Sequence, residues 1–148
     1  MSFSMESLEP AMEARQSTIA RDLKLNLKRL LTESSLEPVE AALSLLATAT
    51  SVEAQDLAGV AREQLARFDV PADQVQEAAE SAAIMGMLNM YYRFKHFIGH
   101  SPDAQADVNY AQAGLRMTAL ARPALGKERF EMLAFAVSVL NGCEMCVI

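Results

Sequence analysis

The sequence has few basic residues: 13 Lys and Arg stand against 19 Asp and Glu, for a net charge of −6. A surface that binds nucleic acid needs clustered Lys and Arg to displace counterions from the phosphates. The densest basic group, formed by Lys24, Lys28 and Arg29, fits the solvated face of a helix. We therefore predict that the protein has no nucleic-acid partner.

Long hydrophobic runs are also missing, since no segment approaches the roughly 20 apolar residues that span a bilayer. The first ten residues, MSFSMESLEP, are acidic, whereas a signal peptide begins with basic residues. These absences predict a cytoplasmic protein without a membrane segment.

Cysteine is scarce, with only Cys143 and Cys146 in the chain, and tryptophan is absent. Two cysteines three positions apart cannot form a disulfide framework that staples a fold. In a reducing compartment this spacing indicates redox or metal chemistry instead.

What the chain has in abundance is aliphatic side chains: 51% of its residues are hydrophobic, only 6% are aromatic, and nine are Met. A chain of 148 residues is long enough to bury one core covering roughly 70% of its unfolded surface. We expect one domain over residues 1–148 with an Ala-rich and easily repacked core.

Apolar residues recur at helical spacing throughout, and no alternating run suggests a strand. The sequence is therefore expected to be all-α. Ser51 is expected to cap the third helix, and Pro123 to stop a short one. The expected helices span residues 19–31, 38–51, 52–68, 73–97, 111–123 and 127–140, with a loop over 99–109.

The segment from Asp73 to Phe97 is apolar nearly all round at its centre. Such a helix must be buried on most sides, in part against a second subunit. Tyr91, Tyr92 and Phe94 within it form either a ligand cradle or, as we favour, core and subunit contacts.

Cys143 and Cys146 follow Asn141-Gly142, a pair suited to closing a helix with a left-handed residue. A Cys-x-x-Cys placed there normally opens a new helix, whose unpaired N–H groups favour a thiolate. The six residues after Gly142 are too few for an independently stable helix. The spacing lets the two sulfurs meet as a disulfide and exchange two electrons, but by itself it also fits a structural or metal-binding role.

Two further groups bear on this dithiol. Glu131 lies near the start of the preceding helix among apolar neighbours. Partial withdrawal from water would make its carboxylate a proton acceptor, although the helix dipole favours Glu there in any case.

His96 and His100 would formally complete a Cys₂His₂ zinc site with the cysteines. Zinc fingers keep such pairs close in sequence, so we favour two partly exposed histidines at a helix end, and no metal.

Several ordered motifs resemble the alkyl hydroperoxide reductase D proteins of the carboxymuconolactone decarboxylase-like superfamily. The similarity runs from about Asp22 to the last residue, through DLKLNL, IMGMLNMYYR, GLRM and FEMLAFAVSVLNGCEMC. It implies an all-helical bundle, usually a trimer, that acts as an antioxidant thiol–disulfide reductase and weak peroxidase. It also implies no bound cofactor: electrons come from lipoamide on a lipoylated acyltransferase and pass to a peroxiredoxin of the alkyl hydroperoxide reductase C type.

Matched residue by residue, the resemblance places Glu131 on the family's relay glutamate, Cys143 on its first cysteine and Cys146 on its second. It implies that Cys146 is the nucleophile that becomes a sulfenic acid. Cys143 then resolves it as a Cys143–Cys146 disulfide.

The chain departs from the family pattern at its end. The family's relay histidine falls four residues after the second cysteine, past Ile148, and we expect a bundle that lacks its C-terminal helices. Two other hypotheses stay open. One is a non-catalytic helical module that oligomerises through residues 84–92. The other is the superfamily's decarboxylase branch, which the cysteine pair disfavours.

Overall fold

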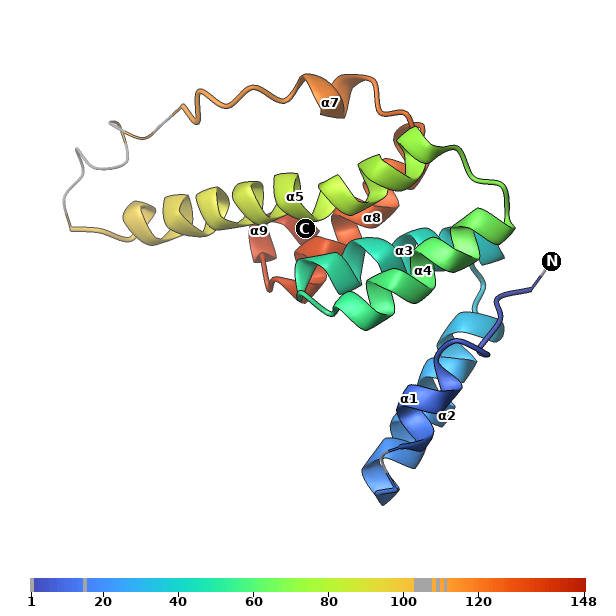
Figure 1. Cartoon of the computed structure of the whole chain (residues 1–148). Helices are drawn as coiled ribbons and strands as arrows, with labels where there is room; N and C mark the ends of the chain where they lie inside the picture. The colour runs from blue at the N-terminus through green and yellow to red at the C-terminus, as the bar shows by residue number, and fades with distance from the viewer. Residues whose placement is uncertain (1, 15, 103–107, 109, 111) are drawn as a thin grey trace.

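The computed structural model describes residues 2–14, 16–102, 108, 110 and 112–148. Every regular element in these ranges is a helix, and the described residues contain no strand. The all-α expectation is confirmed (Figure 1).

Helix α3 (Pro38–Ser51) is the centre of the bundle. It packs against α4 (Gln55–Arg67), α5 (Ala72–Gly99) and α8 (Lys127–Leu140). Pro38 begins the helix, as expected, where its missing N–H costs nothing. Half of its residues are buried because neighbours cover it on several sides: Ala41, Ala42, Leu43, Leu45, Leu46, Ala47 and Ala49.

The turn between α3 and α4 differs from the sequence expectation. Ser51 is the last residue of α3 and does not cap α4, whose N-cap is Ala54. Glu53 adopts a left-handed backbone with φ of 59°, and its N–H and that of Ala54 donate to the carbonyls of Thr50 and Ala49. This C-terminal closure uses three residues that the sequence pattern assigned to the next helix.

Helices α1 (Glu9–Glu13) and α2 (Thr18–Thr32) pair at one end of the molecule and extend away from the bundle (Figure 1). The range predicted for α2 is confirmed, and Ser17 caps it by accepting from the N–H of Ala20. Its apolar stripe is only partly covered, because Leu27 and Leu31 pack against the core while Ile19, Leu23 and Leu30 are exposed.

Helix α5 is the longest element and crosses one face of α3 and α8 (Figure 1). Its first half is buried through Ala78, Ala79, Ala82 and Met85. Farther along, Met87, Met90, Tyr92 and Phe94 are exposed. Within the single chain α5 is therefore buried on one face, which continues through Leu88 and Asn89, and not on most sides.

The segment before α8 also differs from the expectation. Only Thr118–Ala121 is helical (α7), and residues 112–117 are irregular. Gly114 in this stretch has a φ of +61°, a backbone conformation that interrupts a right-handed helix. The loop expected over 99–109 lies mostly outside the described residues.

Within the described ranges, no helix combines the length and apolar character needed to cross a membrane.

Leu133 on α8 is fully buried in the core cluster. Leu133→Ala should lower the free energy of unfolding by about 2–5 kcal/mol, because it removes apolar contacts and leaves a cavity. Denaturant unfolding followed by circular dichroism measures this change. The same substitution at the exposed Leu25 is the control, and an equal loss at both positions would contradict the placement of Leu133.

Candidate functional site

The site begins where α8 ends. Gly142 has a φ of +63°, its N–H donates to the Val139 carbonyl at 3.1 Å, and the Cys143 N–H donates to the Ser138 carbonyl at 3.0 Å. These two bonds satisfy carbonyls of the last helical turn and reverse the chain. The expected closure at Asn141-Gly142 is confirmed, and it delivers Cys143 directly after the turn.

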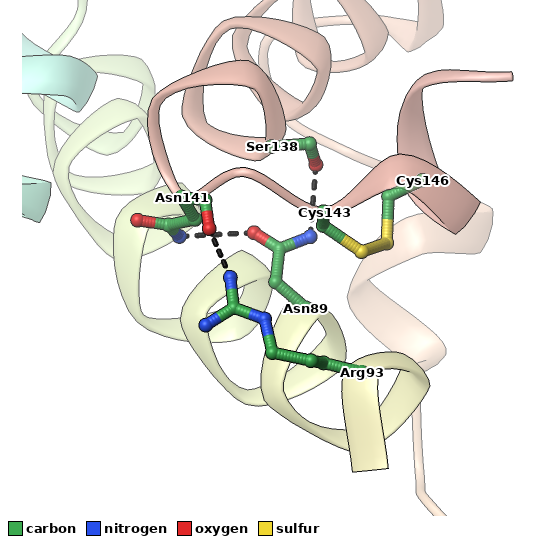
Figure 2. Close-up of a disulfide and its surroundings, with 6 residues drawn as sticks. All are labelled: Asn89, Arg93, Ser138, Asn141, Cys143 and Cys146. Carbon is green, nitrogen blue, oxygen red and sulfur yellow. Dashed lines mark hydrogen bonds between the residues drawn. A yellow bond between two sulfur atoms is a disulfide. The ribbon is translucent and has the colours of Figure 1, made fainter. Parts of the chain in front are cut away.

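Asn141 ties this turn to two other helices. Its side-chain Nδ2 donates to Asn89 Oδ1 at 2.9 Å, and its Oδ1 accepts from the Ser51 hydroxyl of α3 at 3.3 Å. The main-chain carbonyl of Asn141 accepts from the Arg93 guanidinium of α5 (Figure 2). A cation at the carbonyl end of a helix is favourable, so Arg93 stabilises the end of α8 as well as positioning the turn.

Asn89 completes the network from inside the core. It is buried, and its Nδ2 donates to the Oγ of the fully buried Ser138 at 2.9 Å. Buried polar side chains are costly unless they are paired, and here each one finds a partner. Our sequence reasoning missed Asn89, although a polar residue within the apolar run MGMLNMYY was the available signal.

Cys143 and Cys146 are joined as a disulfide, with their Cα atoms 5.4 Å apart. Cys143 is the N-cap of the short helix α9 (Glu144–Val147), so the expected new helix does form. Helix α9 is too short to be stable alone, and its packing against α5 and α8 stabilises it. Cys143 is only 3% exposed, whereas Cys146 is half-buried.

A cavity of about 240 Å³ adjoins this disulfide. The α5 side chains of Arg93, His96 and Phe97 line one wall, and residues 142–145 line the other. His96 is exposed, and its ring centroid lies 4.5 Å from that of His100 with the two rings tilted by 54°. We expected two exposed histidines at a helix end, which is confirmed, but the sequence did not indicate that His96 borders the dithiol.

The described residues hold no group of three or more His, Cys, Asp or Glu placed to bind a metal ion. The sulfurs of both cysteines are committed to the disulfide.

Comparison with curated proteins decides the family. The chain is 38% identical to the alkyl hydroperoxide reductase AhpD of Anaeromyxobacter dehalogenans over 143 residues, which are 97% of this chain and 73% of that protein. The chain belongs to the AhpD family. A relative of the same name from Gluconacetobacter diazotrophicus is 38% identical over 92% of this chain and 71% of its own length. Another from Mycobacterium ulcerans is 36% identical over 98% of this chain and 75% of its own length.

A scan against protein-family models finds no match. At the family level, the shared name supports an enzyme of the alkyl hydroperoxide reductase type.

Glu131, for which the sequence resemblance implies a relay role, lies on the outer face of α8. Its side chain is 66% exposed and its Oε1 lies 3.7 Å from Nζ of Lys127. The expected withdrawal from water is therefore wrong for this structure, because Phe130 and Leu133 turn inward. At about 100° per residue, Glu131 lies about 100° from Phe130 and about 160° from Leu133 around the helix axis. Along the helix axis Glu131 is separated by about 10 Å from Ser138, whose carbonyl accepts from the Cys143 N–H.

Asn89→Ala should lower the free energy of unfolding by about 1–3 kcal/mol, since it leaves the buried Ser138 hydroxyl unpaired. The Gln76→Ala variant, which removes an exposed side chain from the same helix, should be nearly neutral. Combining Asn89→Ala with Ser138→Ala tests the pair, because the two losses should not add. Fully additive losses would indicate that the Asn89–Ser138 bond carries no coupling.

Proposed function

We propose that this AhpD-family chain is an antioxidant thiol–disulfide oxidoreductase that reduces alkyl hydroperoxides through Cys143 and Cys146. The observation that carries the proposal is the Cys143–Cys146 disulfide, held at a helix junction of a chain with AhpD relatives. A dithiol that closes and reopens in this way can accept two electrons and pass them on.

The unequal burial of the two sulfur-bearing residues supports distinct roles. Cys146 is half-buried and is the more accessible of the two. Its thiolate attacks the distal oxygen of a hydroperoxide, so that an S–O bond forms, the O–O bond breaks and an alcohol leaves after taking a proton. Cys143, which is buried, then attacks the sulfenic acid as a thiolate, forming the disulfide and releasing hydroxide, which becomes water on protonation.

Regeneration requires a dithiol that reduces the disulfide. We propose lipoamide on a lipoylated acyltransferase as this donor, and a peroxiredoxin of the alkyl hydroperoxide reductase C type as the acceptor, in the cytoplasm. We further propose a trimer as the working assembly. The exposed Met87, Met90 and Tyr92 of α5 support subunit contact, because exposed apolar patches mark interaction sites.

The same exposed side chains are also compatible with the second candidate, a non-catalytic oligomerisation module within residues 84–92. The two candidates differ in the behaviour of the thiols. Ordinary cysteine titration in the reduced protein would favour the module, whereas a thiolate formed well below pH 8 would favour the enzyme.

Single cysteine variants test the assigned roles. After one exposure to an alkyl hydroperoxide, Cys143→Ser should hold a sulfenic acid at Cys146, because the resolving thiol is missing. A sulfenic-acid trapping reagent and mass spectrometry would detect it. The Cys146→Ser variant should form no adduct and should lose lipoamide-coupled peroxide reduction. Retained turnover in Cys146→Ser would refute the assignment of the nucleophile.

Glu131→Gln tests the proposed relay. If Glu131 exchanges a proton during peroxide reduction, the rate should fall by about 100-fold, the lower range for general acid–base catalysis. Glu128→Gln is the matched control, since Glu128 is an exposed carboxylate in the first turn of the same helix. Equal rates in the two variants, measured with lipoamide and peroxide, would remove Glu131 from the reaction.

A further inference from the structure

The face of α5 that carries Asn89 and Arg93 also carries His96. These residues follow one another at spacings of four and three, which place them in line along a helix surface. Asn89 and Arg93 both extend toward the turn that bears the disulfide (Figure 2). One turn farther on, His96 shares with Cys143 the lining of the 240 Å³ cavity.

Imidazole gains and loses a proton near neutral pH, and so suits the exchange of a proton with a thiol. We propose that His96 is the acid–base partner of Cys143 during disulfide opening and closing. This inference rests on the proposed redox function and adds to it a group from a different helix, some 47 residues ahead of the cysteine in the sequence.

A small dithiol opens the disulfide in two exchange steps. One thiolate of a small dithiol attacks Sγ of Cys146, a mixed disulfide forms, and the electron pair of the broken S–S bond passes to Sγ of Cys143. Protonated His96 donates its proton to this leaving thiolate. The second thiolate of the dithiol then attacks its own mixed-disulfide sulfur, which releases reduced Cys146 and the oxidised cyclic dithiol. In the reverse direction, neutral His96 accepts the Cys143 proton.

Other charged groups border the same cavity. Arg93 faces it from α5 and Glu144 from α9, and α8 contributes no side chain to the lining. The His100 ring makes a tilted contact with the His96 ring, and its Nδ1 lies 2.7 Å from the His96 carbonyl oxygen, but His100 does not line the cavity. Arg93 brings a guanidinium and Glu144 a carboxylate to this lining, and His96 brings its imidazole.

The test uses reduced protein in which Cys146→Ser leaves one thiol. The ultraviolet absorbance of the Cys143 thiolate is followed against pH, with and without His96→Gln. Because His96→Gln removes a cation near the sulfur, the Cys143 thiolate should form at a pH about one unit higher in this variant. His100→Gln is the matched control on the next turn and should leave the titration unchanged.

The second measurement follows opening of the intact disulfide by a small soluble dithiol. His96→Gln should slow it roughly threefold, as expected when a leaving thiol becomes one unit more basic with a Brønsted coefficient near 0.5. His96→Lys keeps a positive charge but does not titrate near neutral pH. The His96→Lys variant should therefore still form the Cys143 thiolate at low pH. Its plot of opening rate against pH should lack the inflection near neutrality.

Identical titrations in His96→Gln and His100→Gln, or an unchanged inflection in His96→Lys, would overturn the role of His96. Neither measurement uses a peroxide. Failure of the peroxide-reductase proposal would therefore appear in the cysteine-variant assay and leave these two readouts intact.

Discussion

The geometry of the site depends on how Asn141 is held. Its side chain bonds to Ser51 of α3 and Asn89 of α5, and its carbonyl accepts from Arg93. Three helices therefore meet at the residue that precedes the left-handed Gly142. Because a bond to each partner constrains a different direction, the turn that carries Cys143 has little freedom to move relative to the core.

This arrangement explains how a helix of four residues can carry half of a redox pair. Helix α9 gains its stability from packing against α5 and α8 rather than from its own length. The same packing buries Cys143 and leaves Cys146 more accessible. A chemical asymmetry between two otherwise equivalent thiols thus follows from the direction in which α9 leaves the turn.

The fold was largely predictable from local pattern. The bounds of α3, and within a few residues those of α2, α5 and α8, follow from apolar periodicity together with Pro38 and Gly142. The errors have local physical causes. Ser51 has the chemistry of an N-cap, but its hydroxyl bonds to Asn141, and Glu53 supplies a left-handed turn that L residues seldom adopt. Gly114 likewise interrupts a helix that composition alone favoured.

The sequence by itself determined the helical class, the place where α8 ends and the presence of a dithiol immediately after it. These are properties of neighbouring residues, which spacing and backbone preference decide. Only the tertiary structure decided that Asn89 and Arg93 hold the turn that bears this dithiol, that His96 borders the cavity beside it, and that Glu131 turns outward. The reason is that the contacts of Asn89, Arg93 and His96 join residues 40 or more positions apart, and the side of a helix that faces the core depends on how whole helices pack rather than on any local pattern.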